Sequence, residues 1–172
     1  MDPHAFGGLF LILTALAGAE KPVSRVPPLG CRLEADRTHA AGAPVRVTFF
    51  LRNRSARAVS ILDWQTPLEG LLGDIFQILP ATGGEPLPYQ GPMVKRRAPQ
   101  SDEYVRISPK GEVSGSVDAA AAYDLTRPGR YTITFRGTLL DVVSGAAPRR
   151  AGRELRPATV SCNSLSIEIT GR

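Results

Sequence analysis

The sequence holds few of the side chains that most often carry out chemistry, with two histidines, two cysteines and one tryptophan in 172 residues. Structural zinc sites use four His or Cys ligands, and these cysteines have no histidine nearby, so we expect neither a metal nor a cofactor. No G-x-S-x-G turn is present, and no glycine cluster opens a helix. These absences favour a binding role over a catalytic one.

Long apolar segments are also missing. The run from Phe6 to Leu16 is too short to span a bilayer and is followed by Ala17-Gly-Ala19, an A-x-A cleavage site. We therefore predict a signal peptide over residues 1–19 and one mature domain over residues 20–172. The mature protein is expected to be secreted or periplasmic, with no membrane segment.

The charge balance is basic but diffuse. The chain carries 21 Lys and Arg against 16 Asp and Glu, and loss of residues 1–19 would remove one acid, Asp2. The basic residues are scattered, which argues against a nucleic-acid partner, whereas an acidic protein surface would suit this charge. We expect the free protein to be a monomer.

The two cysteines lie near the two ends of the domain. Cys31 comes just before the first strand pattern and Cys162 just before the last. In an oxidising compartment they would form a disulfide that ties these ends together. Two buried free thiols are the alternative.

The apolar periodicity is two, which is typical of strands. With 17 Gly and 15 Pro and no convincing amphipathic helix, the pattern predicts an all-β, immunoglobulin-like antiparallel β-sandwich of about seven to eight strands. The segment from Asp124 to Tyr131 resembles a tyrosine corner, and 119–122 could form one helical turn. The clearest strand patterns cover 45–52, 58–62, 74–79, 104–107, 111–117, 131–135 and 164–169.

One loop, Gly91 to Pro99, combines basic and apolar side chains. Pro92 and Pro99 restrict its backbone, so its residues would lose less entropy on docking than those of a free loop. By composition alone such a basic turn is more often solvated surface than a recognition element. The residues that would contact a partner are Met93, Val94, Lys95, Arg96 and Arg97.

Trp64 is interpreted as a plug in the core or at its edge rather than as a platform for a ligand. Pro67 stiffens the corner from Thr66 to Gly70 that follows it. The corner is expected to position the basic loop without touching a partner. It would also direct three apolar side chains inward: Leu71, Leu72 and Phe76.

Other polar residues receive structural interpretations. His39 lies on a polar segment, and Asp63 and Asp74 stand at strand ends, where carboxylates commonly cap turns. Asn53 begins a glycosylation sequon, a short pattern with a high chance rate. The arginine-rich segment 149–156 is expected to be a solvated loop.

The longest distinctive patterns resemble one family. They are D-W-x-T-P-L-E-G-L-x-x-D-I-F from Asp63, Y-x-G-P-M-V-K-R-x-A-P from Tyr89, and the shorter segments 107–111, 116–118 and 123–125. Together they are similar to the amino-terminal pro-domain of the aspzincin metalloendopeptidases, the deuterolysin and peptidyl-Lys type secreted proteases. The resemblance covers most of the chain after its first thirty residues.

The protease motifs of that family are absent. Neither His4 nor His39 begins an H-E-x-x-H, and no G-T-x-x-x-D occurs before the sequence ends at Arg172. The resemblance therefore implies a free-standing pro-domain rather than a protease.

The function implied by the resemblance is binding and inhibition of a secreted zinc metalloendopeptidase, with assistance to its folding as a further role. Because the family cuts beside Lys, Lys95 on a stiff loop would occupy the protease cleft, with Met93 and Val94 at its edge. The alternative is a non-inhibitory envelope or extracellular adhesion module with the same fold.

Overall fold

The computed structural model describes residues 28–148 and 154–171. The predicted signal peptide over 1–19 lies outside the described residues, as do Arg149 and Arg150 of the arginine-rich loop.

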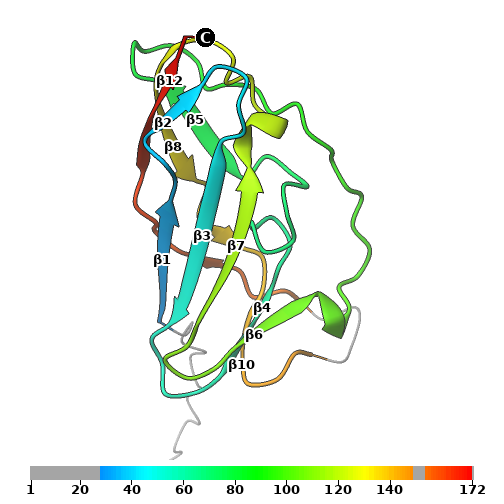
Figure 1. Ribbon diagram of the computed structural model, residues 1–172. Coiled ribbons are helices and arrows are strands. Elements are labelled where there is room, and N and C mark those ends of the chain that lie inside the picture. Colours follow the sequence, from blue (N-terminus) through cyan, green and yellow to red (C-terminus); the bar gives the residue numbers. More distant parts are fainter. Residues whose placement is uncertain (1–27, 149–153, 172) are drawn as a thin grey trace, which may run out of the picture.

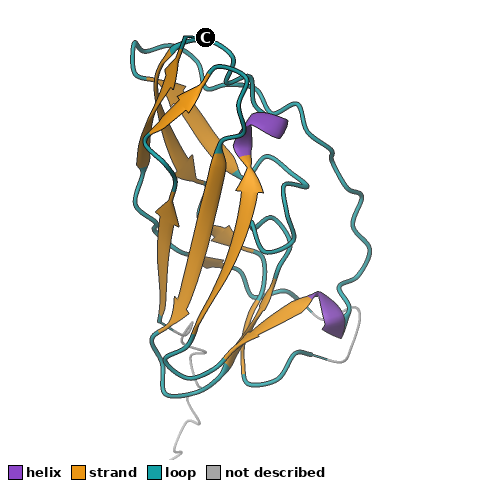
Figure 2. Ribbon diagram, in the orientation of Figure 1, coloured by secondary structure: helices purple, strands orange, loops and turns teal. Residues whose placement is uncertain are grey.

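The described part of the chain forms twelve strands and two 3-10 helices of three residues each (Figures 1 and 2). Eight strands have four or more residues, in agreement with the expected seven to eight, and the other four are short. In chain order the elements are β1 Leu29–Glu34, β2 Thr38–Ala40, β3 Arg46–Asn53, β4 Val59–Leu62, β5 Phe76–Pro80, η1 Ser101–Glu103, β6 Tyr104–Ile107, β7 Glu112–Asp118, η2 Ala119–Ala121, β8 Gly129–Phe135, β9 Thr138–Leu139, β10 Val142–Ser144, β11 Ala158–Thr159 and β12 Leu165–Thr170.

Two sheets form the layers of a sandwich, one with strand order β1-β3-β7 and the other β2-β12-β8-β5. The ring of Phe49 on β3 lies 5.1 Å from that of Phe135 on β8, so the two inner faces meet in one core. Within the described residues, all pairings are antiparallel apart from β2 with β12. The expected all-β sandwich is confirmed.

A third sheet, β10-β4-β6, lies near the end of the molecule where β3 ends and β7 begins (Figure 1), and β4 is buried along its whole length. Beside it lies a buried carboxylate, Asp141. One of its oxygens accepts a hydrogen bond from the Tyr104 hydroxyl at 2.5 Å and the other from the backbone N–H of Arg156 at 2.9 Å. These bonds hold β6 against the turn between β9 and β10.

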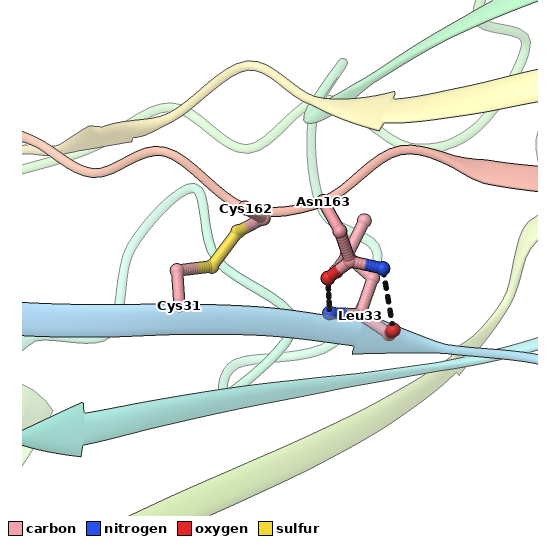
Figure 3. The surroundings of a disulfide bond; sticks show 4 residues. All are labelled: Cys31, Leu33, Cys162 and Asn163. Carbon is pink, nitrogen blue, oxygen red and sulfur yellow. Dashed lines mark hydrogen bonds between the residues drawn. A yellow bond between two sulfur atoms is a disulfide. The ribbon is translucent and has the colours of Figure 1, made fainter.

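The predicted disulfide between Cys31 and Cys162 is present (Figure 3). Cys31 lies within β1 rather than before the first strand. The sequence did not reveal β1 because its alternation is weaker than that of β3. Next to the bond, the Asn163 side chain donates to the Leu33 carbonyl at 3.1 Å and accepts from its N–H at 2.9 Å. The Asn163 side chain thus makes the two hydrogen bonds to Leu33 that the backbone of a neighbouring strand would make.

Several local predictions can be compared with the structure. The Tyr131 hydroxyl donates to the Arg127 carbonyl at 2.9 Å, which is the expected tyrosine-corner bond. Phe76 is fully buried, whereas Leu72 is only half-buried and does not join the main core. Asn53 is fully buried, and the two N–H groups of its side chain are shared among three backbone carbonyls, so its role here is structural.

Candidate functional site

The corner between β4 and β5, residues 63–70, is built by its own hydrogen bonds. The buried Thr66 hydroxyl donates to the Asp63 carbonyl at 2.6 Å and accepts from the Leu68 N–H at 3.2 Å. Gln65 has φ of 56°, an uncommon value for a residue with a side chain, and its N–H donates to a Glu69 carboxylate oxygen at 2.6 Å. Glu69 therefore stabilises the turn from inside.

This corner packs directly on β7 at Gly115. A Cβ atom at Gly115 would lie 2.3 Å from the Pro67 carbonyl oxygen, so only glycine fits there. Pro67 is buried at this contact, and Trp64 is buried beneath the corner but outside the main core cluster. The predicted plug role of Trp64 agrees with this position.

The connection from β5 to β6 runs outside the sheets, along one side of the molecule to η1 (Figure 1). Tyr89 fixes its first half, because its hydroxyl lies 2.8 Å from the Pro92 carbonyl and 3.0 Å from the Leu71 carbonyl. Its single proton can be donated to one of them at a time. A Cβ at Gly91 would lie 2.6 Å from the same hydroxyl, which explains the glycine between the two.

Arg96 fixes the second half of the loop. One guanidinium nitrogen lies 2.5 Å from Glu69 Oε2, and the guanidinium carbon lies 4.9 Å from the centre of the Trp64 ring. The side chains are 26% exposed for Arg96 and 7% for Glu69, so the carboxylate is shielded while the guanidinium keeps contact with water. The planar guanidinium of Arg can stack on an aromatic ring and pair with a carboxylate at the same time, which the ammonium group of Lys does less well. We call Trp64, Glu69 and Arg96 the clasp.

A further ion pair follows at the end of the loop. Arg97 lies 3.8 Å from Glu103 Oε1, and the other oxygen of Glu103 accepts the Gln100 N–H at 2.6 Å, which caps η1. Arg97 itself stays exposed, so this pair contributes little energy, in the range of about 0–1 kcal/mol. Pro99 stands between these two features and leads the chain into η1.

Three carboxylates surround the base of the loop. Burial, together with the neighbouring negative charges of Glu69 and Glu103, raises the pKa of Asp63 to about 6. Arg96 opposes this rise, but by less. Two of these carboxylates, Glu69 and Glu103, pair with the positive charges of Arg96 and Arg97.

Between the two anchors lies a three-residue tip, Met93–Lys95. Met93 is 82% exposed and Val94 is 45% exposed, and these are the exposed large apolar side chains of the described residues. Lys95 is exposed as well, and it takes part in none of the ion pairs formed among the described residues. The tip presents one cation and two apolar side chains to solvent.

The structure divides the five predicted loop residues into two groups. Met93, Val94 and Lys95 point outward, whereas Arg96 is turned into the clasp and Arg97 faces η1. The sequence analysis missed Glu69 and Tyr89 as anchors. Both belong to the two quoted motifs, D-W-x-T-P-L-E-G and Y-x-G-P, and the ordered spacing of charged and aromatic residues in them was the available signal.

Asp74 and His39 have structural partners. Asp74 accepts a hydrogen bond from the Tyr123 hydroxyl at 2.9 Å and pairs with Arg136 at 2.6 Å. His39 on β2 has backbone carbonyls 3.2 Å and 2.9 Å from its two ring nitrogens. Among residues 28–148 and 154–171, no group of three or more His, Cys, Asp or Glu is placed to hold a metal ion, and no helix is long and apolar enough to cross a membrane.

Comparison with known proteins gives one informative relative. No protein-family model matches the chain. An extracellular protease of Aeromonas hydrophila is 26% identical to it over 127 residues, which are 74% of this chain and 34% of the protease. The chain thus spans about a third of the length of that relative.

Proposed function

We propose that this domain binds an aspzincin-type zinc metalloendopeptidase outside the cell and inhibits it by placing Lys95 in the active-site cleft. The observation that carries the proposal is the exposed tip Met93–Lys95, held on one side by Tyr89 and on the other by the clasp. A peptide segment whose ends are fixed and whose side chains are free loses little entropy when it docks.

Two lines of support come from likeness to other proteins. The motifs that build the corner and the loop are those that resemble an aspzincin pro-domain, and the Aeromonas hydrophila relative is named as an extracellular protease. The disulfide indicates an oxidising compartment, which agrees with a place outside the cytoplasm.

The charge of the tip also fits the proposal. Enzymes that cut beside Lys need a negatively charged subsite, and Lys95 is a cation with no ion-pair partner in its own described domain. Met93 and Val94 would be buried at the rim of such a cleft, and Met adapts well to irregular apolar surfaces. We assign the domain a binding rather than a catalytic role.

The test is to mix the purified domain with a purified aspzincin protease on a separate chain. We expect a complex on gel filtration and a loss of cleavage of a lysine-containing peptide. A complex that leaves the protease fully active would favour the non-inhibitory binding module, and no complex would contradict the proposal.

A further inference from the structure

The structure suggests what happens when a protease cuts the tip, an inference that rests on the proposed function. A peptide bond beside Lys95 lies between two independent attachments. On the amino-terminal side, the Pro92 carbonyl is bound by the Tyr89 hydroxyl at 2.8 Å. On the carboxyl-terminal side, Arg96 is held by Glu69 at 2.5 Å and by the Trp64 ring.

The fold also interleaves the two parts of the chain that such a cut would separate. Every strand up to β5 precedes the tip and every strand from β6 follows it. Five pairings join a strand of the first part to one of the second: β3 with β7, β4 with β6, β4 with β10, β5 with β8, and β2 with β12. The disulfide from Cys31 to Cys162 joins the same two parts covalently.

We propose that the domain stays folded and keeps both new chain ends in place after hydrolysis of the Lys95–Arg96 bond, so that the cut domain continues to bind the protease. In this step the carbon–nitrogen bond breaks, the Lys95 carbonyl carbon gains the hydroxyl of water, and the Arg96 nitrogen gains its proton. An ordinary loop substrate would lose its ordered ends once cut. Here the clasp retains Arg96 and Tyr89 retains Pro92.

The structural half of this inference can be tested without the cognate protease. The sequence contains three lysines, Lys21, Lys95 and Lys110, so a Lys21→Arg/Lys110→Arg background leaves Lys95 as the target of a lysine-specific serine endopeptidase that cuts after Lys. We expect one cut, two fragments on a reducing gel and one band on a non-reducing gel. The melting temperature of the cut domain should remain within about 5 °C of the intact value. A much larger loss would overturn the inference.

The functional half compares intact and cut domain as inhibitors of an aspzincin protease. We expect the cut domain to bind within about tenfold of the intact one, because both ends of the tip remain held. Glu69→Gln should weaken the cut domain by roughly 10- to 100-fold and the intact domain much less, since after the cut only the clasp retains Arg96. Glu112→Gln is the matched control, because it removes a carboxylate of β7 that pairs with Arg32 of β1 and with no residue of the loop.

The outcomes separate this inference from the proposed function. If the intact domain inhibits but the cut, folded domain does not, the inference fails and the proposed function stands. If the intact domain does not inhibit, the proposed function fails, and with it the continued binding after cleavage. Equal loss of binding by Glu69→Gln in the intact and cut forms would also contradict the role of the clasp.

Discussion

The guanidinium of Arg96 lies over the ring of Trp64, with 4.9 Å between the guanidinium carbon and the ring centre. The two residues belong to the two motifs on which the family resemblance depends, and the fold brings them together. A charge that the sequence analysis assigned to a partner surface is therefore used to hold the loop. Lys95 remains as the exposed cation of the tip.

The first prediction concerns this contact. Because Trp64 is the sole tryptophan, its fluorescence reports on the clasp alone. The buried ring should emit at short wavelength and be poorly quenched by acrylamide. Arg96→Ala should uncover one face of the ring and increase quenching, whereas Arg97→Ala should not. Equal quenching in both variants would show that Arg96 does not cover Trp64 in solution.

Removal of the ring should be costly to the fold. Trp64→Ala is expected to lower the free energy of unfolding by about 3–5 kcal/mol, the range for deleting a large buried aromatic side chain. Urea denaturation followed by circular dichroism measures the change. A loss below 1 kcal/mol would contradict the assignment of Trp64 as a buried support.

Gly115 gives a prediction about backbone contact. Gly115→Ala would place a Cβ atom 2.3 Å from the Pro67 carbonyl oxygen, so the corner must move away from β7. We expect a loss of about 1–3 kcal/mol, as for other overpacked sites. Gly73→Ala is the control, because a Cβ there meets nothing within 4 Å, and its effect on stability should be small.

The pKa of Asp63 predicts a dependence of stability on pH. Its folded-state value of about 6 is above the ordinary value of 3.8, so the folded protein binds the proton more tightly than the unfolded chain. The free energy of unfolding should therefore fall as pH rises through this window. Asp63→Asn should be more stable than the wild type at pH 8, by about 1 kcal/mol because water screens this partly exposed carboxylate, and nearly equal to it at pH 4.

The control for that experiment is Asp102→Asn, which removes an exposed carboxylate from η1. It should leave the difference between pH 4 and pH 8 almost unchanged. An Asp63→Asn variant that follows the wild-type pH profile would contradict the raised pKa.

The disulfide should contribute substantially to stability. It links residues 131 positions apart, and closing so long a loop restricts the unfolded chain by about 4–5 kcal/mol at most. The Cys31→Ser/Cys162→Ser variant should melt roughly 5–15 °C lower, and reductant should shift the wild type in the same direction. Two free thiols in protein purified without reductant would contradict the bond.

Much of the fold could be predicted because its longer strands alternate clearly. The pattern over 104–107 coincides with β6, and that over 45–52 differs from β3 by one residue at each end. The strands that were missed, such as β9 and β11, have two residues each, too few to show a period. Their existence depends on partners that are distant in sequence, for example Ala158 opposite Leu139.

The site was predictable only in part, for a related reason. Proline and charge content located the loop, but the direction of each side chain depends on the corner that packs against it. The sequence around Arg96 does not indicate that Glu69 is its partner, because Glu69 is positioned by the turn at Gln65. Likewise, Tyr89 acts as an anchor because its ring packs over Gly91 and its hydroxyl reaches the Pro92 carbonyl, a contact that the sequence does not show.

The proposed mechanism places Lys95 in the cleft of an aspzincin protease. The most direct measurement is the inhibition constant of the wild-type domain against a purified protease of that family, compared with Lys95→Gln and with Lys110→Gln as a lysine on another exposed turn. We predict inhibition by the wild type and by Lys110→Gln. Lys95→Gln should lose about 2–5 kcal/mol of binding, roughly a thirtyfold to several-thousandfold weaker complex. Equal inhibition by all three proteins would contradict cleft insertion by Lys95.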